Sequence, residues 1–104
     1  MLYTPDAWVV LKTAPDVHKV LASWGGGFLD GDSWKLNSGI TKIVETADAY
    51  EIHGWSGSVY RCMKTRERLS GYSSSVLANF KKAIPDIELV AIEKVLPLYD
   101  KKTI

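Results

Sequence analysis

The sequence predicts an α+β fold: an antiparallel β-meander of about five to seven strands, with one helix from the C-terminal half packed on the sheet. Two observations support this prediction. Short runs rich in β-branched and aromatic residues follow one another up to residue 64, separated by tight turns of Gly, Pro, Asp and Ser. Such turns join antiparallel strands, because parallel strands need long crossovers. A clear helical spacing of apolar residues follows the last of these runs.

Two strands are expected before the three consecutive glycines at 25–27, over Trp8–Thr13 and His18–Trp24. The predicted strands after the glycines are Ser33–Asn37, Ile40–Thr46, Tyr50–Trp55 and Ser58–Lys64. The stretch from 18 to 64 is therefore expected to form a meander. Neither face of its last two strands is cleanly polar, so we expect both sides of the sheet to be partly covered.

The helix is predicted to begin after Ser73–Ser75, whose hydroxyl groups can cap its N-terminus, and to stop at Pro85. The apolar residues at helical spacing are Val76, Leu77, Phe80 and Ile84. Residues 87–95 are predicted as a last strand, with a helix as the competing interpretation, and residues 96–104 as a tail.

Length and composition predict one domain over residues 1–104. The chain is 46% hydrophobic and holds a single cysteine, Cys62, which cannot form an internal disulfide. Its N-terminal residues lack the basic and apolar segments of a signal peptide, and its apolar runs are shorter than the roughly 20 residues of a membrane span. We therefore expect a cytoplasmic protein without a membrane partner.

The charge balance limits the partners that the sequence favours. Thirteen basic and twelve acidic side chains give a net charge of +1. A general polyanion-binding protein would carry an excess of Lys and Arg, so this class is disfavoured, whereas a local basic patch remains open.

The residues that could support catalysis are few. His53 and Cys62 would pair as base and nucleophile if neighbouring strands placed them together. Asp30 and Asp32 flank a glycine, and their carboxylates could bind a hard cation. A packed thiol and a solvated turn explain the same residues. The sequence therefore predicts no catalytic residue, no metal and no cofactor, and an enzyme is the least favoured of three hypotheses.

The aromatic residues are unusually numerous, with four Trp and five Tyr. Trp and Tyr are enriched at interfaces because they combine a large contact area with one polar tip. Although each of them is also a good core residue, we predict that Trp24, Trp34, Trp55 and Tyr60 form a contact surface for another protein.

A basic cluster follows the last meander strand. It comprises Arg61, Lys64, Arg66 and Arg68, with Tyr60 and Tyr72 nearby. Cations interleaved with aromatic platforms suit single-stranded nucleic acid. A binder of single-stranded nucleic acid or of a nucleotide is therefore the alternative hypothesis, and an ordinary solvated turn is the structural explanation of the same residues.

Three stretches of the chain resemble small accessory proteins of tailed bacteriophages. These are Tyr3–Val10, Gly31–Ile40 and Gly54–Tyr60, so that the likeness covers about the first two thirds of the chain. It includes no catalytic motif and transfers no residue role. The resemblance implies expression in the cytoplasm of an infected bacterium and, for such proteins, binding to a host component.

The leading hypothesis is thus a non-enzymatic binding module that acts on another protein, with a host protein as one candidate. A homodimer is expected if an apolar face of the sheet proves to be uncovered.

Overall fold

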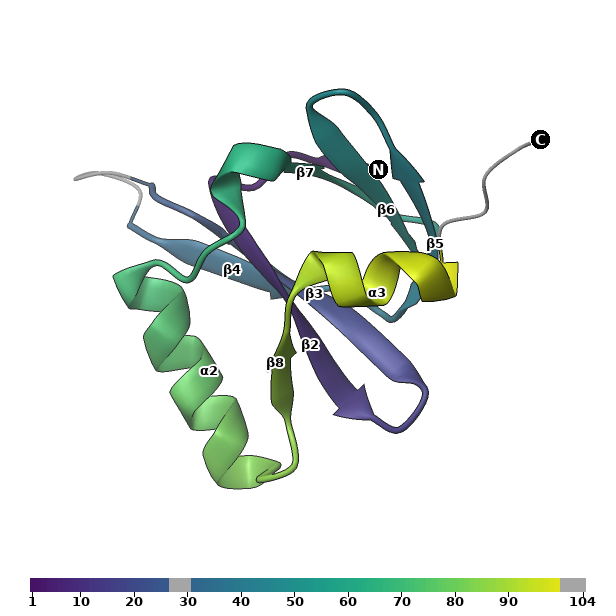
Figure 1. The fold of residues 1–104 in the computed structure, drawn as a ribbon. Helices are drawn as coiled ribbons and strands as arrows, with labels where there is room; N and C mark the ends of the chain where they lie inside the picture. Colours follow the sequence, from purple (N-terminus) through teal and green to yellow (C-terminus); the bar gives the residue numbers. More distant parts are fainter. Residues whose placement is uncertain (27–30, 100–104) are drawn as a thin grey trace.

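The computed structural model describes residues 1–26 and 31–99 and confirms the predicted α+β class (Figure 1). The strands are β1 (Leu2–Tyr3), β2 (Ala7–Ala14), β3 (Val17–Trp24), β4 (Ser33–Leu36), β5 (Ile40–Glu45), β6 (Ala49–Gly54), β7 (Val59–Met63) and β8 (Glu88–Val90). The helices are the 3₁₀-helix η1 (Lys64–Arg66) and the α-helices α2 (Gly71–Ala83) and α3 (Ile92–Tyr99).

The strands form two four-stranded sheets where the sequence predicted one meander. Sheet A has the order β1-β7-β6-β5, and sheet B has the order β4-β3-β2-β8. Neighbouring strands are antiparallel except for β1 and β7, which are parallel. The meander divides after β4, because the chain leaves sheet B there and enters sheet A with β5.

The crossing at residues 37–39 is fixed by Asn37 and Gly39. The Asn37 side-chain oxygen accepts a hydrogen bond from the Val20 N–H at 2.8 Å. The backbone N–H of Asn37 donates to the Val20 carbonyl at 3.0 Å. Gly39 follows with φ of 140°, a conformation that essentially only glycine adopts. This short segment therefore connects two sheets, although its composition is that of a hairpin turn.

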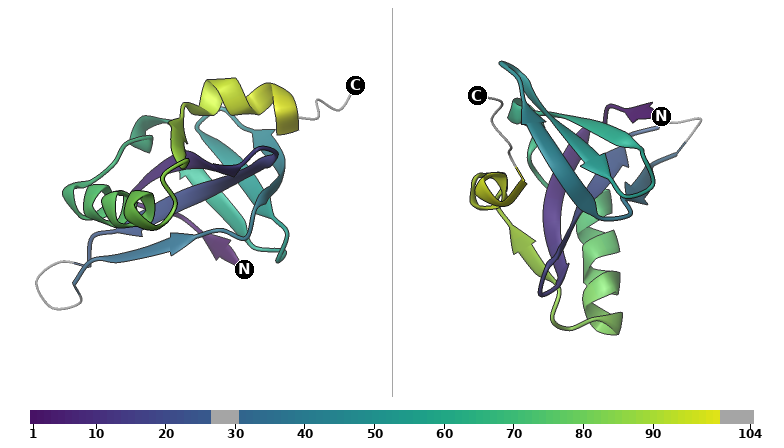
Figure 2. Two further views of the ribbon diagram at one scale, coloured as in Figure 1. Left: turned by 90° about the horizontal axis from the view of Figure 1, so that it is seen from below. Right: turned by 90° about the vertical axis from the view of Figure 1, so that its right-hand side faces the viewer.

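Two apolar clusters cover the two faces of sheet B. Helices α2 and α3 lie on opposite sides of strand β2 of this sheet (Figure 2). Trp8 and Val10 project from β2 into the larger cluster, which lies between the sheets and includes side chains of α3. Val9 and Leu11 project to the opposite side, where they pack with Leu77 of α2. Successive residues of β2 are buried because this strand has a layer on each side.

Helix α2 begins at Gly71, three to five residues earlier than a cap within Ser73–Ser75 would place it. Its N-cap is Ser70, whose Oγ accepts a hydrogen bond from the Ser73 N–H at 3.0 Å. In return the Ser70 N–H donates to Ser73 Oγ at 2.8 Å, which completes a capping box. The prediction of a cap at Ser73–Ser75 was therefore wrong, whereas the end of the helix just before Pro85 is confirmed.

The prediction of a strand over residues 87–95 and a tail over residues 96–104 was largely wrong. Only Glu88–Val90 is a strand, and Ile92–Tyr99 is helical, so residues 96–99 of the predicted tail belong to α3. The Glu67 carboxylate accepts a hydrogen bond from the Ile92 N–H at 2.8 Å and so caps the new helix. Ile92 and Val95 are buried in the core between the sheets. Residues 100–104 of the predicted tail lie outside the described residues.

Candidate functional site

The structure does not bring the predicted aromatic residues together. In the pairing of β3 with β4, Ser23 lies opposite Trp34 and Trp24 lies opposite Ser33, so Trp24 and Trp34 project to opposite faces of sheet B. The Trp24 indole packs edge-on against Tyr3 with a centroid distance of 6.1 Å. The Trp34 ring packs edge-on against Phe80 of α2 at 5.2 Å. The two tryptophans therefore cannot share one contact surface.

Tyr60 is a core residue, and its prediction as a contact residue was wrong. Its side chain is 3% exposed and stacks on Tyr3 with a centroid distance of 5.0 Å. It lies opposite Ile52 of β6, and both side chains enter the core between the sheets. Burial is also the main cause that raises the pKa of its hydroxyl group.

Trp55 is the predicted contact residue with the greatest exposure, at 62% of its surface. It follows β6, and its N–H donates a hydrogen bond to the Gly39 carbonyl at 3.0 Å. The indole lies directly over Gly39, where an added Cβ would come within 3.0 Å of three ring carbons. The next residue is also fixed, since the Ser56 N–H donates to Ser38 Oγ at 2.9 Å. Trp55 is therefore exposed and held in place.

Trp55 lies at one end of the outer face of sheet A, the face turned away from the core. In β5 and β6 the side chains of Ile43 and Ile52 enter the core, so their chain neighbours project outward. The side chains on the outer face are Leu2, Lys42, Val44, Ala49, Glu51, His53, Val59, Arg61 and Met63, with Trp55 beyond His53 by the same alternation. Leu2 is 59% exposed and Val44 38%. Neither core cluster of the described residues includes a side chain of this face.

The expectation that both sides of the predicted sheet are partly covered therefore holds for sheet B, whereas no core cluster of the described residues lies on the outer face of sheet A. Sheet B lies between α2 and the interior core, whereas sheet A contributes one face only. The mixed polarity of β6 and β7 arises because Glu51, His53 and Arg61 stand on the outer face beside Val59.

The four cations of the predicted basic cluster are dispersed. Arg61 lies on the outer face, opposite Glu51 of β6. Lys64 forms an ion pair with Glu45 at 2.6 Å. Arg66 donates to the Asp6 carbonyl at 3.3 Å. Arg68 lines a cavity at the start of α2, so the four cations do not follow one strand of nucleic acid.

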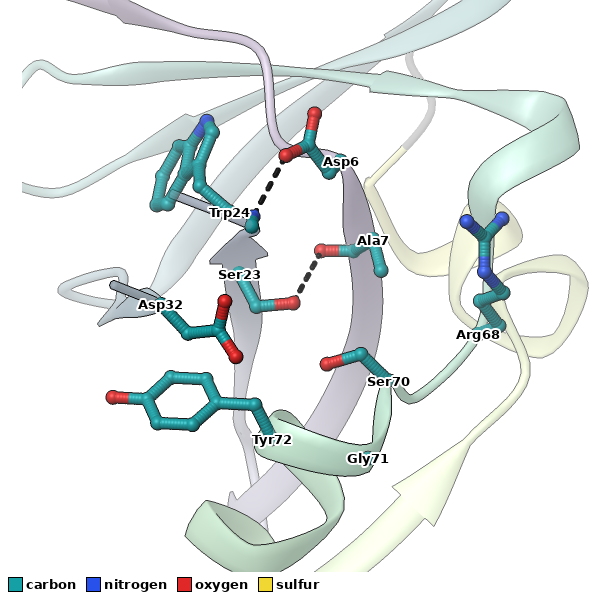
Figure 3. Close-up of a pocket in the computed structure, with 10 residues that line it drawn as sticks. Asp6, Ala7, Ser23, Trp24, Asp32, Arg68, Ser70, Gly71 and Tyr72 are labelled. Atoms are coloured by element: carbon teal, nitrogen blue, oxygen red, sulfur yellow. Dashed lines mark hydrogen bonds between the residues drawn. The ribbon is translucent and has the colours of Figure 1, made fainter. Parts of the chain in front are cut away.

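The cavity beside Arg68 has a volume of about 420 Å³ (Figure 3). Its wall includes Asp6, Asp32 and Tyr72, whereas the Trp24 indole points away from it. Asp6 accepts a hydrogen bond from the Gly25 N–H at 2.8 Å. A phosphate at the N-terminus of α2 would lie near two carboxylates, which opposes a nucleotide in this cavity.

The residues considered for catalysis are separated. Cys62 lies opposite Tyr50 and is fully buried, and this burial raises the pKa of its thiol far above the usual value. His53 lies opposite Val59 on the outer face, so the sheet separates it from Cys62. Asp30 lies outside the described residues, and Asp32 is exposed. Among residues 1–26 and 31–99, no group of three or more His, Cys, Asp or Glu side chains could hold a metal ion.

A contact that the sequence did not predict joins β3 to the last turn of α3. His18 is 7% exposed, and its Nδ1 lies 2.9 Å from the Tyr99 hydroxyl. Burial lowers the pKa of His18 from its ordinary value of 6.5, nearby Lys12 lowers it further, and Asp16 partly opposes this change. The two residues are 81 positions apart, so no local pattern could have revealed the pair.

Stability is expected to fall as the pH drops below 6.5, since the unfolded chain then binds a proton at His18 before the folded chain does. The loss should continue down to the lowered pKa of the folded state. Urea unfolding at several pH values measures it. The His18→Gln variant should lose part of this pH dependence, whereas His53→Gln should keep it. An unchanged pH dependence in His18→Gln would contradict the assignment.

No helix in the described part of the chain is long and apolar enough to cross a membrane. Comparison of the chain with protein-family models, with curated proteins and with solved structures finds no match.

Proposed function

We propose that this chain is a non-enzymatic binding module that docks another protein on the outer face of sheet A, with Trp55 as the anchor. The observation that supports this proposal most is that the Trp55 side chain is exposed and yet held in one position. The indole is 62% exposed, yet it rests on Gly39 and follows a backbone hydrogen bond to the same residue. A large aromatic side chain that is already ordered loses little entropy on binding.

The rest of the outer face has the mixed composition of protein interfaces. Leu2, Val44 and Val59 provide apolar area, and Lys42 and Arg61 provide charges around it. Aromatic anchors at interfaces carry most of the binding energy, while the neighbouring contacts mainly exclude water. Trp55 is therefore expected to dominate the affinity for a partner.

Nucleic acid remains the alternative ligand for the same face. Trp55 could stack on a base, and Lys42 and Arg61 could contact phosphates. The carboxylate of Glu51 lies between these two cations and opposes a polyanion. This arrangement favours a protein partner over a single strand of nucleic acid.

The test is capture of partners by the tagged full chain from bacterial lysate, followed by mass spectrometry. Lysate is chosen because the phage resemblance proposes a bacterial cytoplasm as the setting. We expect a defined protein to be retained by the wild type and reduced about tenfold or more by Trp55→Ala, which corresponds to about 1.4 kcal/mol.

The matched control is Leu98→Ala, because Leu98 is 64% exposed and lies on α3, away from the outer face. This variant should retain the partner at the wild-type level. Equal capture by Trp55→Ala and the wild type would refute the proposed function. Recovery of an oligonucleotide, with retention that falls steeply with salt, would instead support the alternative.

A further inference from the structure

We propose that the outer face of sheet A also binds a second copy of this chain, related by a two-fold axis that runs along the strands between β6 and β7. The inference rests on the proposed function, because it assigns a second use to the same face. Self-association would then cover the face that docks the other protein, so the two events would compete.

The central charges of the face are arranged for self-pairing. The register of β6 with β7 places Glu51 directly beside Arg61. Within the described residues, no ion pair joins these two side chains. A two-fold rotation about an axis parallel to the strands places β6 of one copy over β7 of the other. It leaves the position of each residue along the strand direction unchanged. Glu51 then faces Arg61 of the partner subunit, and Arg61 faces the partner's Glu51.

The adjacent row of the face fits the same axis. Lys42, His53, Val59 and Leu2 lie in register across the four strands. The rotation places His53 over the partner's Val59, and the aliphatic stem of Lys42 over the partner's Leu2. Each polar side chain of this row therefore meets an apolar one, while the row with Glu51 and Arg61 supplies two opposite-charge contacts. Like charges do not face each other in either row.

The size of the face determines how strong such a dimer can be. Strands spaced about 4.8 Å apart and about five residues long give a footprint roughly 20 Å across. Two such faces would pack about 10 Å apart, as the sheets of a β-sandwich do. Because this area is at the small end of specific interfaces, we expect micromolar or weaker self-association.

Sedimentation velocity of the full chain from micromolar to near-millimolar concentration tests the proposal. The wild type should show a monomer–dimer equilibrium. Glu51→Arg and Arg61→Glu should each weaken it by about tenfold or more, because each places like charges opposite each other twice in the dimer. An equimolar mixture of the two variants should dimerise again, since every facing pair is then opposite in charge.

The control variant is Lys82→Glu, an equally large charge change on the exposed side of α2, and it should leave the equilibrium unchanged. Far-UV circular dichroism confirms that each variant is folded. A wild type that stays monomeric throughout, a dimer insensitive to both charge reversals, or a mixture that fails to associate would overturn the proposal.

The same experiments separate this proposal from the proposed function. If the protein is monomeric but captures a partner through Trp55, only self-association is refuted. A charge-sensitive dimer without such capture refutes the proposed function instead.

Discussion

Replacing Trp8 with alanine is expected to lower the free energy of unfolding by about 3–5 kcal/mol. Trp8 is 1% exposed and stands in the core between the sheets, edge-on to Tyr50 at 6.0 Å. Its indole N–H donates to the Met63 carbonyl at 2.8 Å. Alanine would leave a large cavity and would deprive this carbonyl of its partner. Domains of this size have a net stability of about 5–15 kcal/mol, so the variant would lose a large part of it.

Urea unfolding followed by circular dichroism measures this loss. Trp55→Ala is the matched control, because it removes the same side chain from the surface and is expected to cost about 1 kcal/mol or less. Trp8→Phe keeps much of the ring but cannot donate to Met63, so it should fall between the two. If Trp8→Ala and Trp55→Ala cost the same, the division of these tryptophans between core and surface is wrong.

The local part of the fold could be predicted because strands, turns and helices depend on neighbouring residues. The strand expected over Trp8–Thr13 is found at Ala7–Ala14, and the helix ends before Pro85 as predicted. The division into two sheets could not be predicted in this way. The segment 37–39 has the composition of a hairpin turn, yet β4 before it pairs with β3 and β5 after it pairs with β6 of the other sheet.

The positions of the candidate site residues could be predicted only in part, for the same reason. Tyr60 and Trp55 are both aromatic residues close to one hairpin, and alternation alone cannot say which face of a strand is turned to the core. The packing of Ile52 against the opposite sheet decides it, so that Tyr60 is buried and Trp55 lies outside. The C-terminal helix is capped by Glu67, whose carboxylate accepts a hydrogen bond from the Ile92 N–H 25 positions away. Long-range contacts of this kind leave no local pattern.

Replacing Gly39 with alanine is expected to cost about 2–3 kcal/mol of stability. Gly39 has φ of 140°, so any side chain there is strained. In addition, the new Cβ would come within 3.0 Å of the Trp55 ring, which must move. Gly57→Ala separates the two effects, because Gly57 also has a positive φ, of 90°, but nothing lies within 4 Å of an added Cβ. Gly57→Ala should therefore cost less, about 1–2 kcal/mol.

A double-mutant cycle measures the contact itself. In the Trp55→Ala background, Gly39→Ala should cost about 1 kcal/mol less than in the wild type, because the ring that it displaces is absent. The same cost in both backgrounds would show that the indole does not rest on Gly39. The cycle also bears on function. If the glycine holds Trp55 in its binding position, Gly39→Ala should weaken partner capture while Gly57→Ala retains it, although both variants carry backbone strain near the same hairpin.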